Sequence, residues 1–265
     1  MQAIREQRLI DPQPIYTMWL REMKRFFRIK ARVVGSLLMP FLFLAFMGLP
    51  LSLMPTREIP GIPEGMGFFD FFAPGIVGMS LLFSATMSGA SVIWDKEFGF
   101  LKEVLVAPVS RLSVILGRSL GGMTTSIIQA LIIVGIAAAM GVRIAGVSGF
   151  LLAVVFMILT SATFTGFGLI LGTKLGNSEA FMAVINLIVF PIFFLSGAIF
   201  PVAAMPSWLG YVMYLDPLTY GVDGLRGALV GAAQLPLWLD FVVLLVLSII
   251  MTVLGAYFFS KMEAD

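Results

Sequence analysis

Cysteine and histidine are both absent from this chain of 265 residues. Their absence excludes disulfides, thiol nucleophiles, imidazole bases, and the thiolate or imidazole ligands of zinc and heme sites. Charged residues are also scarce, at 12% of the sequence, whereas soluble domains carry about 25%. Hydrophobic residues make up 59%. The composition is that of a membrane protein.

Six apolar segments are long enough to cross a bilayer. A spanning helix needs roughly 20 apolar residues, because each residue advances about 1.5 Å through a hydrocarbon core about 30 Å thick. Val242–Val253 is apolar on every face, whereas a strand of a membrane barrel would alternate apolar and polar residues. We predict an all-α polytopic membrane protein with spans at Val33–Met54, Phe71–Ile93, Ser119–Met140, Gly149–Gly172, Ala180–Phe200 and Phe241–Ser260.

The first 32 residues are basic and lack the short apolar core of a signal peptide. Within Ile15–Ile29, the apolar side chains of Trp19, Met23, Phe26 and Phe27 share one broad face, and most of the basic side chains lie elsewhere. This pattern predicts an amphipathic helix in the membrane interface. It fits either a basic flank that fixes the topology or a specific docking element.

The distribution of positive charge predicts the orientation. With both termini in the cytoplasm, fourteen of the 17 lysines and arginines fall on the cytoplasmic side. The other three are Arg57, Arg143 and Arg226. This imbalance follows the positive-inside rule of multi-pass proteins in the cell membrane. Since no internal repeat or low-complexity linker divides the chain, residues 1–265 are expected to form one membrane domain.

The segment Pro201–Asp240 is apolar but repeatedly interrupted by prolines and glycines. It also contains Asp216, Asp223 and Arg226, and a charge at the centre of a spanning helix costs about 2.5–3.5 kcal/mol. Broken backbone at membrane depth is tolerated only against protein or water. We therefore predict an outer re-entrant segment at residues 201–240 rather than a seventh span.

A cytoplasmic loop at residues 94–118 is longer than the two to eight residues, roughly, of a tight helix connection. Phe98, Leu101 and Leu105 recur at helical spacing, and Pro108 ends the pattern. The loop therefore predicts a short helix with one apolar face. Such a helix either lies in the lipid headgroup region or docks against a partner protein.

Two motifs give the chain a resemblance to a known family. The run from Asp95-Lys96-Glu97 to Pro108-Val109-Ser110-Arg111 resembles the cytoplasmic loop of ABC transporter type-2 permeases. The segment Leu195–Leu229 is similar to the one before the last span in that family, especially in drug-export and lipo-oligosaccharide-export members. The order of elements agrees along nearly the whole chain.

The resemblance implies a dimeric exporter permease that works with a separate ATPase subunit. Its loop helix would be a coupling helix whose apolar side chains enter a groove of the ATPase, with charged neighbours at the rim. No GxxxxGK[ST] phosphate-binding loop occurs in the sequence, so no cofactor is expected on this chain, and ATP and Mg²⁺ are expected on the partner. The implied coupling residues are Glu97, Phe98, Leu101, Lys102, Glu103 and Leu105.

A few polar residues are further candidates for function. Gln129 and Asn186 carry amides within predicted spans, and they serve either a translocation path or helix packing. Asp216 before Pro217 predicts the start of a short outer helix. On that helix, Asp223 and Arg226 lie three residues apart and can pair. They form either a structural ion pair or, together with Asp216, part of an outer gate.

The preferred function is therefore export of a hydrophobic drug, lipid or lipid-linked glycan, driven by ATP on a partner chain. An ion-coupled carrier is an alternative, although carboxylates within the spans, which relay protons in such carriers, are scarce. A non-transporting membrane scaffold is another. An intramembrane enzyme would need a pair of aspartates or a serine–lysine pair within the spans, and the sequence shows neither.

Overall fold

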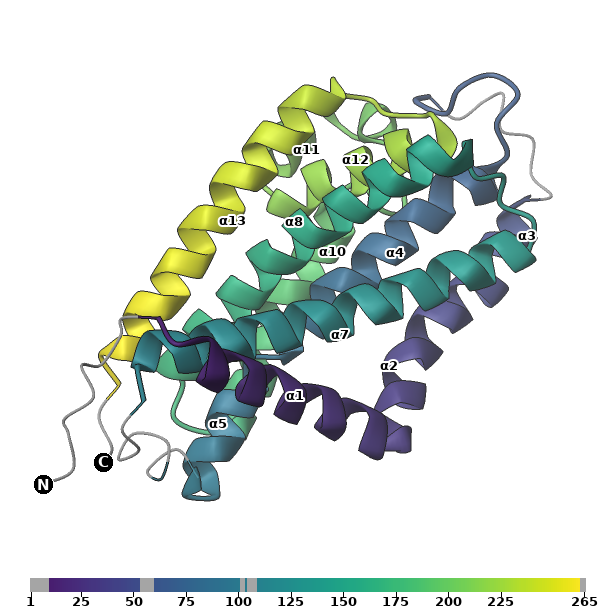
Figure 1. Ribbon diagram of the computed structural model, residues 1–265. Coiled ribbons are helices and arrows are strands. Elements are labelled where there is room, and N and C mark those ends of the chain that lie inside the picture. Colours follow the sequence, from purple (N-terminus) through teal and green to yellow (C-terminus); the bar gives the residue numbers. More distant parts are fainter. Residues whose placement is uncertain (1–9, 53–59, 101–102, 104–108, 263–265) are drawn as a thin grey trace, which may run out of the picture.

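The protein is a bundle of helices (Figure 1). The computed structural model describes residues 10–52, 60–100, 103 and 109–262, and within these ranges it has no strand. Six helical segments there are long and apolar enough to cross a membrane: Val33–Leu51, Phe68–Glu97, Arg111–Ala139, Gly146–Lys174, Ser178–Leu195 and Leu237–Ser260. The predicted all-α class and the six predicted spans are confirmed.

The second and third spans extend further than predicted. The second consists of α4 (Phe68–Met87) and α5 (Ala90–Glu97), and the third is α7 (Arg111–Ala139), which begins well before Ser119. Both extensions carry charged residues that the sequence pattern assigned to the loop. Two of these charged residues, Asp95 and Arg118, pair with each other inside the bundle, as described below.

The first and fifth spans each contain a stretch of π-helix. Pro50 and Pro191 lack a backbone N–H, so the carbonyl groups of Phe46 and Leu187, four residues earlier, lose their α-helical donors. Both carbonyls lie in the π-helical stretches, which is how these spans absorb a proline without ending. The elements are α2 (Lys30–Leu42), η1 (Phe43–Gly48) and α3 (Leu49–Ser52), then α9 (Ser178–Val184), η3 (Ile185–Val189) and α10 (Phe190–Leu195).

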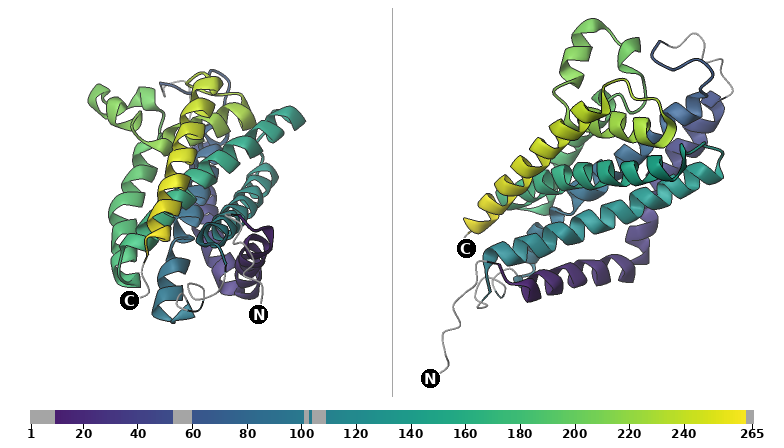
Figure 2. Two further views of the ribbon diagram at one scale, coloured as in Figure 1. Left: turned by 60° about the vertical axis from the view of Figure 1, so that its left-hand side comes forward. Right: turned by 45° about the horizontal axis from the view of Figure 1, so that its top comes forward.

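The helix α4 is the centre of the bundle. Of its most apolar stretch, 78% is buried, against 17% in α13 (Leu237–Ser260). It packs against α7 and α8 (Gly146–Lys174), while α13 runs along the outside of α8 (Figures 1 and 2). Among the described spans, α4 is the one covered on nearly all sides, and the others leave broad apolar faces uncovered within this chain.

The described ends of the chain lie at the same end of the bundle. The N–H of Asp11 donates to Ser113 Oγ at 2.8 Å, and Arg111 Nη1 donates to the carbonyl oxygen of Ser260 at 2.8 Å. The start of α7 thus meets both the first described residues and the last turn of α13. We call this the α5 end, because α5 also lies there (Figure 1).

At the opposite end, which we call the α12 end, the segment before the last span folds into three short helices. They are η4 (Val202–Ala204), α11 (Ser207–Met213) and α12 (Pro217–Val230), and α12 packs on α4, α8 and α13. As predicted, Asp216 is the N-cap of α12, and its side chain accepts from the N–H of Leu218 at 2.8 Å. None of the three helices is a candidate span, but the side of the membrane they occupy stays a prediction.

The amphipathic helix predicted near the N-terminus is α1 (Pro12–Arg28), and it lies along α7. Close approach is possible because α7 carries glycine at the contact: a Cβ added at Gly117 would come within 2.4 Å of the carbonyl oxygen of Ile15. Met18, Met23 and Phe26 are buried in this contact. The apolar face of α1 is therefore used for packing against the bundle.

Candidate functional site

The predicted coupling segment begins at the last turn of α5. The phenyl ring of Phe98 is 82% exposed, although it directly follows a largely buried helix. Glu103 is also exposed. Leu101, Lys102 and Leu105 lie outside the described residues, so their predicted roles stay predictions.

Glu97 connects the second span to the fifth. Its carboxylate accepts from the backbone N–H of Ser178 at 2.9 Å and from the Ser178 hydroxyl at 2.9 and 3.0 Å. Ser178 is the first residue of α9, where a carboxylate is favoured by the helix dipole. Glu97 therefore ties the beginning of the predicted coupling segment to the fifth span.

Next to this segment, Asp95, Arg21 and Arg118 form a buried charge cluster. Asp95 is 4% exposed and accepts from Arg118 on α7 and from Arg21 on α1. Arg118 is 1% exposed, and it also donates to the hydroxyl of Ser91 at 3.3 Å. A buried charge is tolerated only when it is paired. The cluster therefore fixes the relative positions of α1, α5 and α7.

Sequence reasoning missed this cluster. It placed Asp95 and Arg118 in the cytoplasmic loop and treated Arg21 as part of a basic interfacial face. Part of the signal was present, because Ser110 is a good N-cap and no proline lies between it and Ser119. Starting the third span at Arg111 places Arg118 about two turns inside it.

Cation–π contacts extend the link from α1 toward the coupling segment. The Arg21 guanidinium lies over the ring of Phe100 at 4.0 Å, and that of Arg25 lies over Trp94 at 4.8 Å. The basic side of α1 therefore partly holds the start of the predicted loop. This favours the docking role of the amphipathic helix.

At the α12 end, Asp223 and Arg226 form the pair that their spacing predicts, with Arg226 Nη1 4.0 Å from Asp223 Oδ1. Both side chains are mainly engaged by backbone groups. The Asp223 carboxylate accepts from the N–H groups of Gln234 and Leu235 at 2.7–3.0 Å. Arg226 donates to the carbonyl oxygens of Phe71 at 3.2 Å and Gly197 at 3.0 Å.

Through these contacts, the Asp223–Arg226 pair links α12 to α4, to the turn after α10 and to the segment before α13. Burial lowers the pKa of Arg226 to about 10, with Asp223 opposing the shift, so the guanidinium stays charged at neutral pH. Burial raises the pKa of Asp216 to about 7, despite the hydrogen bond from Leu218. The geometry favours a structural role for all three residues. Their predicted part in an outer gate stays a prediction.

Asp240 is a second residue at this end that sequence reasoning missed. It lies in the first turn of α13 and is fully buried, at 0% exposure. Within the described part of the chain, neither carboxylate oxygen has a hydrogen-bond partner. The sequence carried no sign of this, since an aspartate in the first turn of a helix usually faces water and the helix dipole.

The two amides proposed for a translocation path do not meet. Gln129 is 4% exposed and lines a cavity of about 320 Å³ between α2, α4 and α7. Asn186 lies in the π-helical stretch η3 and is exposed on the outside of the subunit. Among the described residues, only Gln129 of the pair faces a cavity within the subunit.

Comparison with known proteins fixes the family. Residues 13–230 match the family model described as ABC-2 type transporter. The chain belongs to this family. It is therefore a multi-pass membrane permease of an ABC transporter, and the family implies an ATPase as its partner.

Three relatives show the range of the likeness. The putative transport permease ycf38 of Cyanophora paradoxa is 30% identical over 202 residues, which cover 75% of this chain and 69% of the relative. The inner membrane transport permease YadH of Escherichia coli K12 is 25% identical over 210 residues, 78% of this chain and 79% of the relative. The probable multidrug ABC transporter permease YbhR of the same strain is 24% identical over 155 residues, which cover 58% of this chain and 42% of the relative.

Proposed function

We propose that this permease forms a dimer and exports a hydrophobic drug, lipid or lipid-linked glycan, with energy from a separate ATPase that docks at the α5 end. The observation that carries the proposal is the exposed ring of Phe98, which closely follows Asp95 and Glu97, the two residues that anchor this part of the chain to Arg21 and Ser178. An apolar side chain at the tip of a charged, multiply anchored segment suits insertion into a groove of a partner.

The contacts of this segment also suggest how a movement of the ATPase reaches the membrane. A displacement of Phe98 acts through Glu97 on the fifth span, and through Asp95 on α1 and on α7. Three elements would then move together rather than one. This arrangement supports a driven permease over a scaffold, because firm links would pass a movement of the loop to several helices at once.

Dimer formation is supported by the exposed amide of Asn186 and its neighbour Leu187, which is 75% exposed. An amide that faces lipid lacks hydrogen-bond partners and is costly, whereas one between two subunits can pair with its own counterpart. We further propose the cell membrane as the location, with the α5 end in the cytoplasm, since fourteen of the 17 lysines and arginines then lie inside.

The test is ATP hydrolysis by the affinity-purified permease complex from native membranes. We expect vanadate-sensitive hydrolysis and a co-purified chain with a phosphate-binding loop. Phe98→Asp should abolish both, because a charge would enter an apolar groove at a cost of several kcal/mol. Lys96→Ala is the control, since Lys96 is an exposed neighbour whose loss should cost under about 1 kcal/mol.

Two results would contradict the proposal. Transport that persists without any ATP-hydrolysing partner would favour the ion-coupled carrier. A Phe98→Asp variant that retains its partner and its full hydrolysis would show that the ATPase docks elsewhere.

A further inference from the structure

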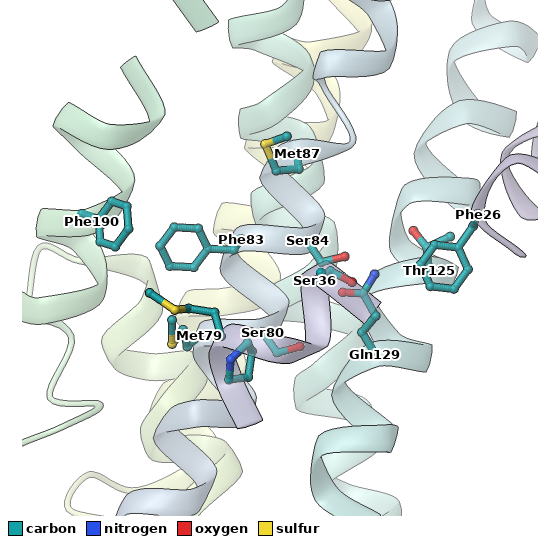
Figure 3. A pocket seen from close by; sticks show the side chains of 13 residues that line it. Phe26, Ser36, Met79, Ser80, Phe83, Ser84, Met87, Thr125, Gln129 and Phe190 are labelled. Carbon is teal, nitrogen blue, oxygen red and sulfur yellow. The ribbon is translucent and has the colours of Figure 1, made fainter. Parts of the chain in front are cut away.

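A cavity in the membrane-spanning part of the bundle has one polar and one apolar side. It lies between α2, α4 and α7, reaches α10, and has a volume of about 320 Å³. This is near the lower end of ligand pockets, which measure roughly 300–1,000 Å³. Figure 3 shows its labelled side chains, with Ser36, Ser84 and Gln129 gathered on one side and Met79, Phe83 and Phe190 on the other.

The polar side has unused hydrogen-bonding groups. Ser80 is 3% exposed, and within the described part of the chain its hydroxyl has no hydrogen-bond partner. No hydrogen bond joins the Gln129 amide to the described residues either, although Gln129 is 4% exposed. A buried group without a partner costs about 1–3 kcal/mol. These two groups are therefore placed to bind something that enters the cavity.

The apolar side is shaped by aromatic and thioether side chains. The rings of Phe83 and Phe190 meet edge to face, with their centroids 4.9 Å apart. Met79 lies beside them, and Met39 on α2 lines the cavity while its side chain is half exposed. Flexible methionines adapt to ligands of varied shape. The half-exposed Met39 also places the cavity at the outer surface of the subunit, where a compound dissolved in the bilayer can reach it.

Charge limits the kind of compound that fits. No aspartate, glutamate, lysine or arginine is among the described residues that line the cavity. A charged group would lose its hydration there without gaining an opposite charge, which is strongly unfavourable. A hydroxyl, ester or amide would gain hydrogen bonds from the polar side instead.

We propose that this cavity binds the uncharged polar group of an amphiphile that enters from the bilayer, with Ser80 and Gln129 as its hydrogen-bonding partners. The apolar body of the compound lies against Phe83 and Met79. This inference rests on the proposed transport function and narrows the transported compounds to neutral amphiphiles.

The test is photolabelling of the purified permease in lipid nanodiscs with a diazirine-bearing monoacylglycerol, in the absence of nucleotide. Labelled peptides should come from α4 or α7, and unlabelled monoacylglycerol should compete. Gln129→Leu and Ser80→Ala should each raise the concentration needed for half-maximal labelling about threefold to tenfold, the effect of one hydrogen bond in a buried site.

A matched pair of glycine variants separates occupation of the cavity from general damage. Gly35 lines the cavity, and a Cβ added there would have no heavy atom within 4 Å, so Gly35→Trp can place a large side chain at the cavity without a clash at its Cβ. Gly135 on α7 is equally open but does not line the cavity. Labelling should be lost in Gly35→Trp and retained in Gly135→Trp, with thermal unfolding confirming that both variants fold.

Equal labelling of the wild type, Gln129→Leu and Gly35→Trp would overturn the proposal. So would stronger labelling by a diazirine-bearing lysophosphatidic acid, since an anionic group would then be preferred. Neither result depends on ATP or on the partner, so failure here is distinct from failure of the proposed ATPase coupling.

Discussion

The two ends of the bundle hold their buried charges in different ways. At the α5 end, Asp95 binds Arg21 and Arg118, so side chains from three separate helices meet. At the α12 end, Asp223 and Arg226 mainly bind backbone N–H and carbonyl groups. The α5 end therefore joins helices to one another through their side chains, whereas the α12 end joins loops through their backbone groups.

The largest effect is expected at the α5 end. Arg118→Ala leaves Asp95 buried with only the more exposed Arg21 as a partner, and breaking a buried ion pair in this way costs about 3–5 kcal/mol. We expect a large drop in the unfolding temperature of the purified permease. Arg111→Ala is the control, because its exposed guanidinium binds only carbonyl groups at the end of α13 and should cost under about 1 kcal/mol. An equal drop in unfolding temperature for Arg118→Ala and Arg111→Ala would show that the buried ion pair of Arg118 contributes no more to stability than the exposed contacts of Arg111.

Substitution of two aspartates at the α12 end should affect stability differently. Asp223→Ala leaves the N–H groups of Gln234 and Leu235 without their acceptor, and because these hydrogen bonds are only partly buried, each loss should cost about 1 kcal/mol. Asp240→Asn removes a buried carboxylate that no described residue hydrogen-bonds, so stability should stay the same or rise. Thermal unfolding and limited proteolysis between α12 and α13 measure both effects. Greater damage from Asp240→Asn than from Asp223→Ala would contradict this account of the α12 end.

Asp216 at the α12 end should also make the stability of the protein depend on pH. Burial raises its pKa from 3.8 to about 7, so the folded protein binds a proton that the unfolded chain releases between these values. Stability should therefore fall as pH rises from about 4 to 7. Asp216→Asn should flatten this slope while keeping a side-chain oxygen that accepts from Leu218. An unchanged slope of unfolding temperature against pH would show that Asp216 is not its source.

The architecture was largely predictable because apolar runs long enough to cross a bilayer admit few alternatives. The six spans, the cap at Asp216 and the spacing of Asp223 and Arg226 all followed from local pattern. The cluster at Asp95 did not, because its three members come from distant parts of the chain. A lone charge near a predicted span end gives no sign of whether it faces water or a partner.

The cavity was only half predictable for the same reason. Gln129 stood out because an amide within a span is costly unless it faces a partner or a polar space. Asn186 had the same sequence signal, but the structure places it on the outer surface of the subunit. Which side of a fully apolar helix faces the interior depends on packing between spans, and α8 and α13 show almost no periodic difference between their faces.

The central claim is that an ATPase docks at the α5 end, and photo-crosslinking from two exposed aromatic positions tests it most directly. Phe98 and Tyr211 are 82% and 76% exposed and lie at opposite ends of the bundle. A photoreactive phenylalanine analogue placed at each position, in native membranes, should capture an ATP-binding chain from position 98 and none from position 211. Capture of that chain from position 211 instead, or of lipid alone from position 98, would contradict the account.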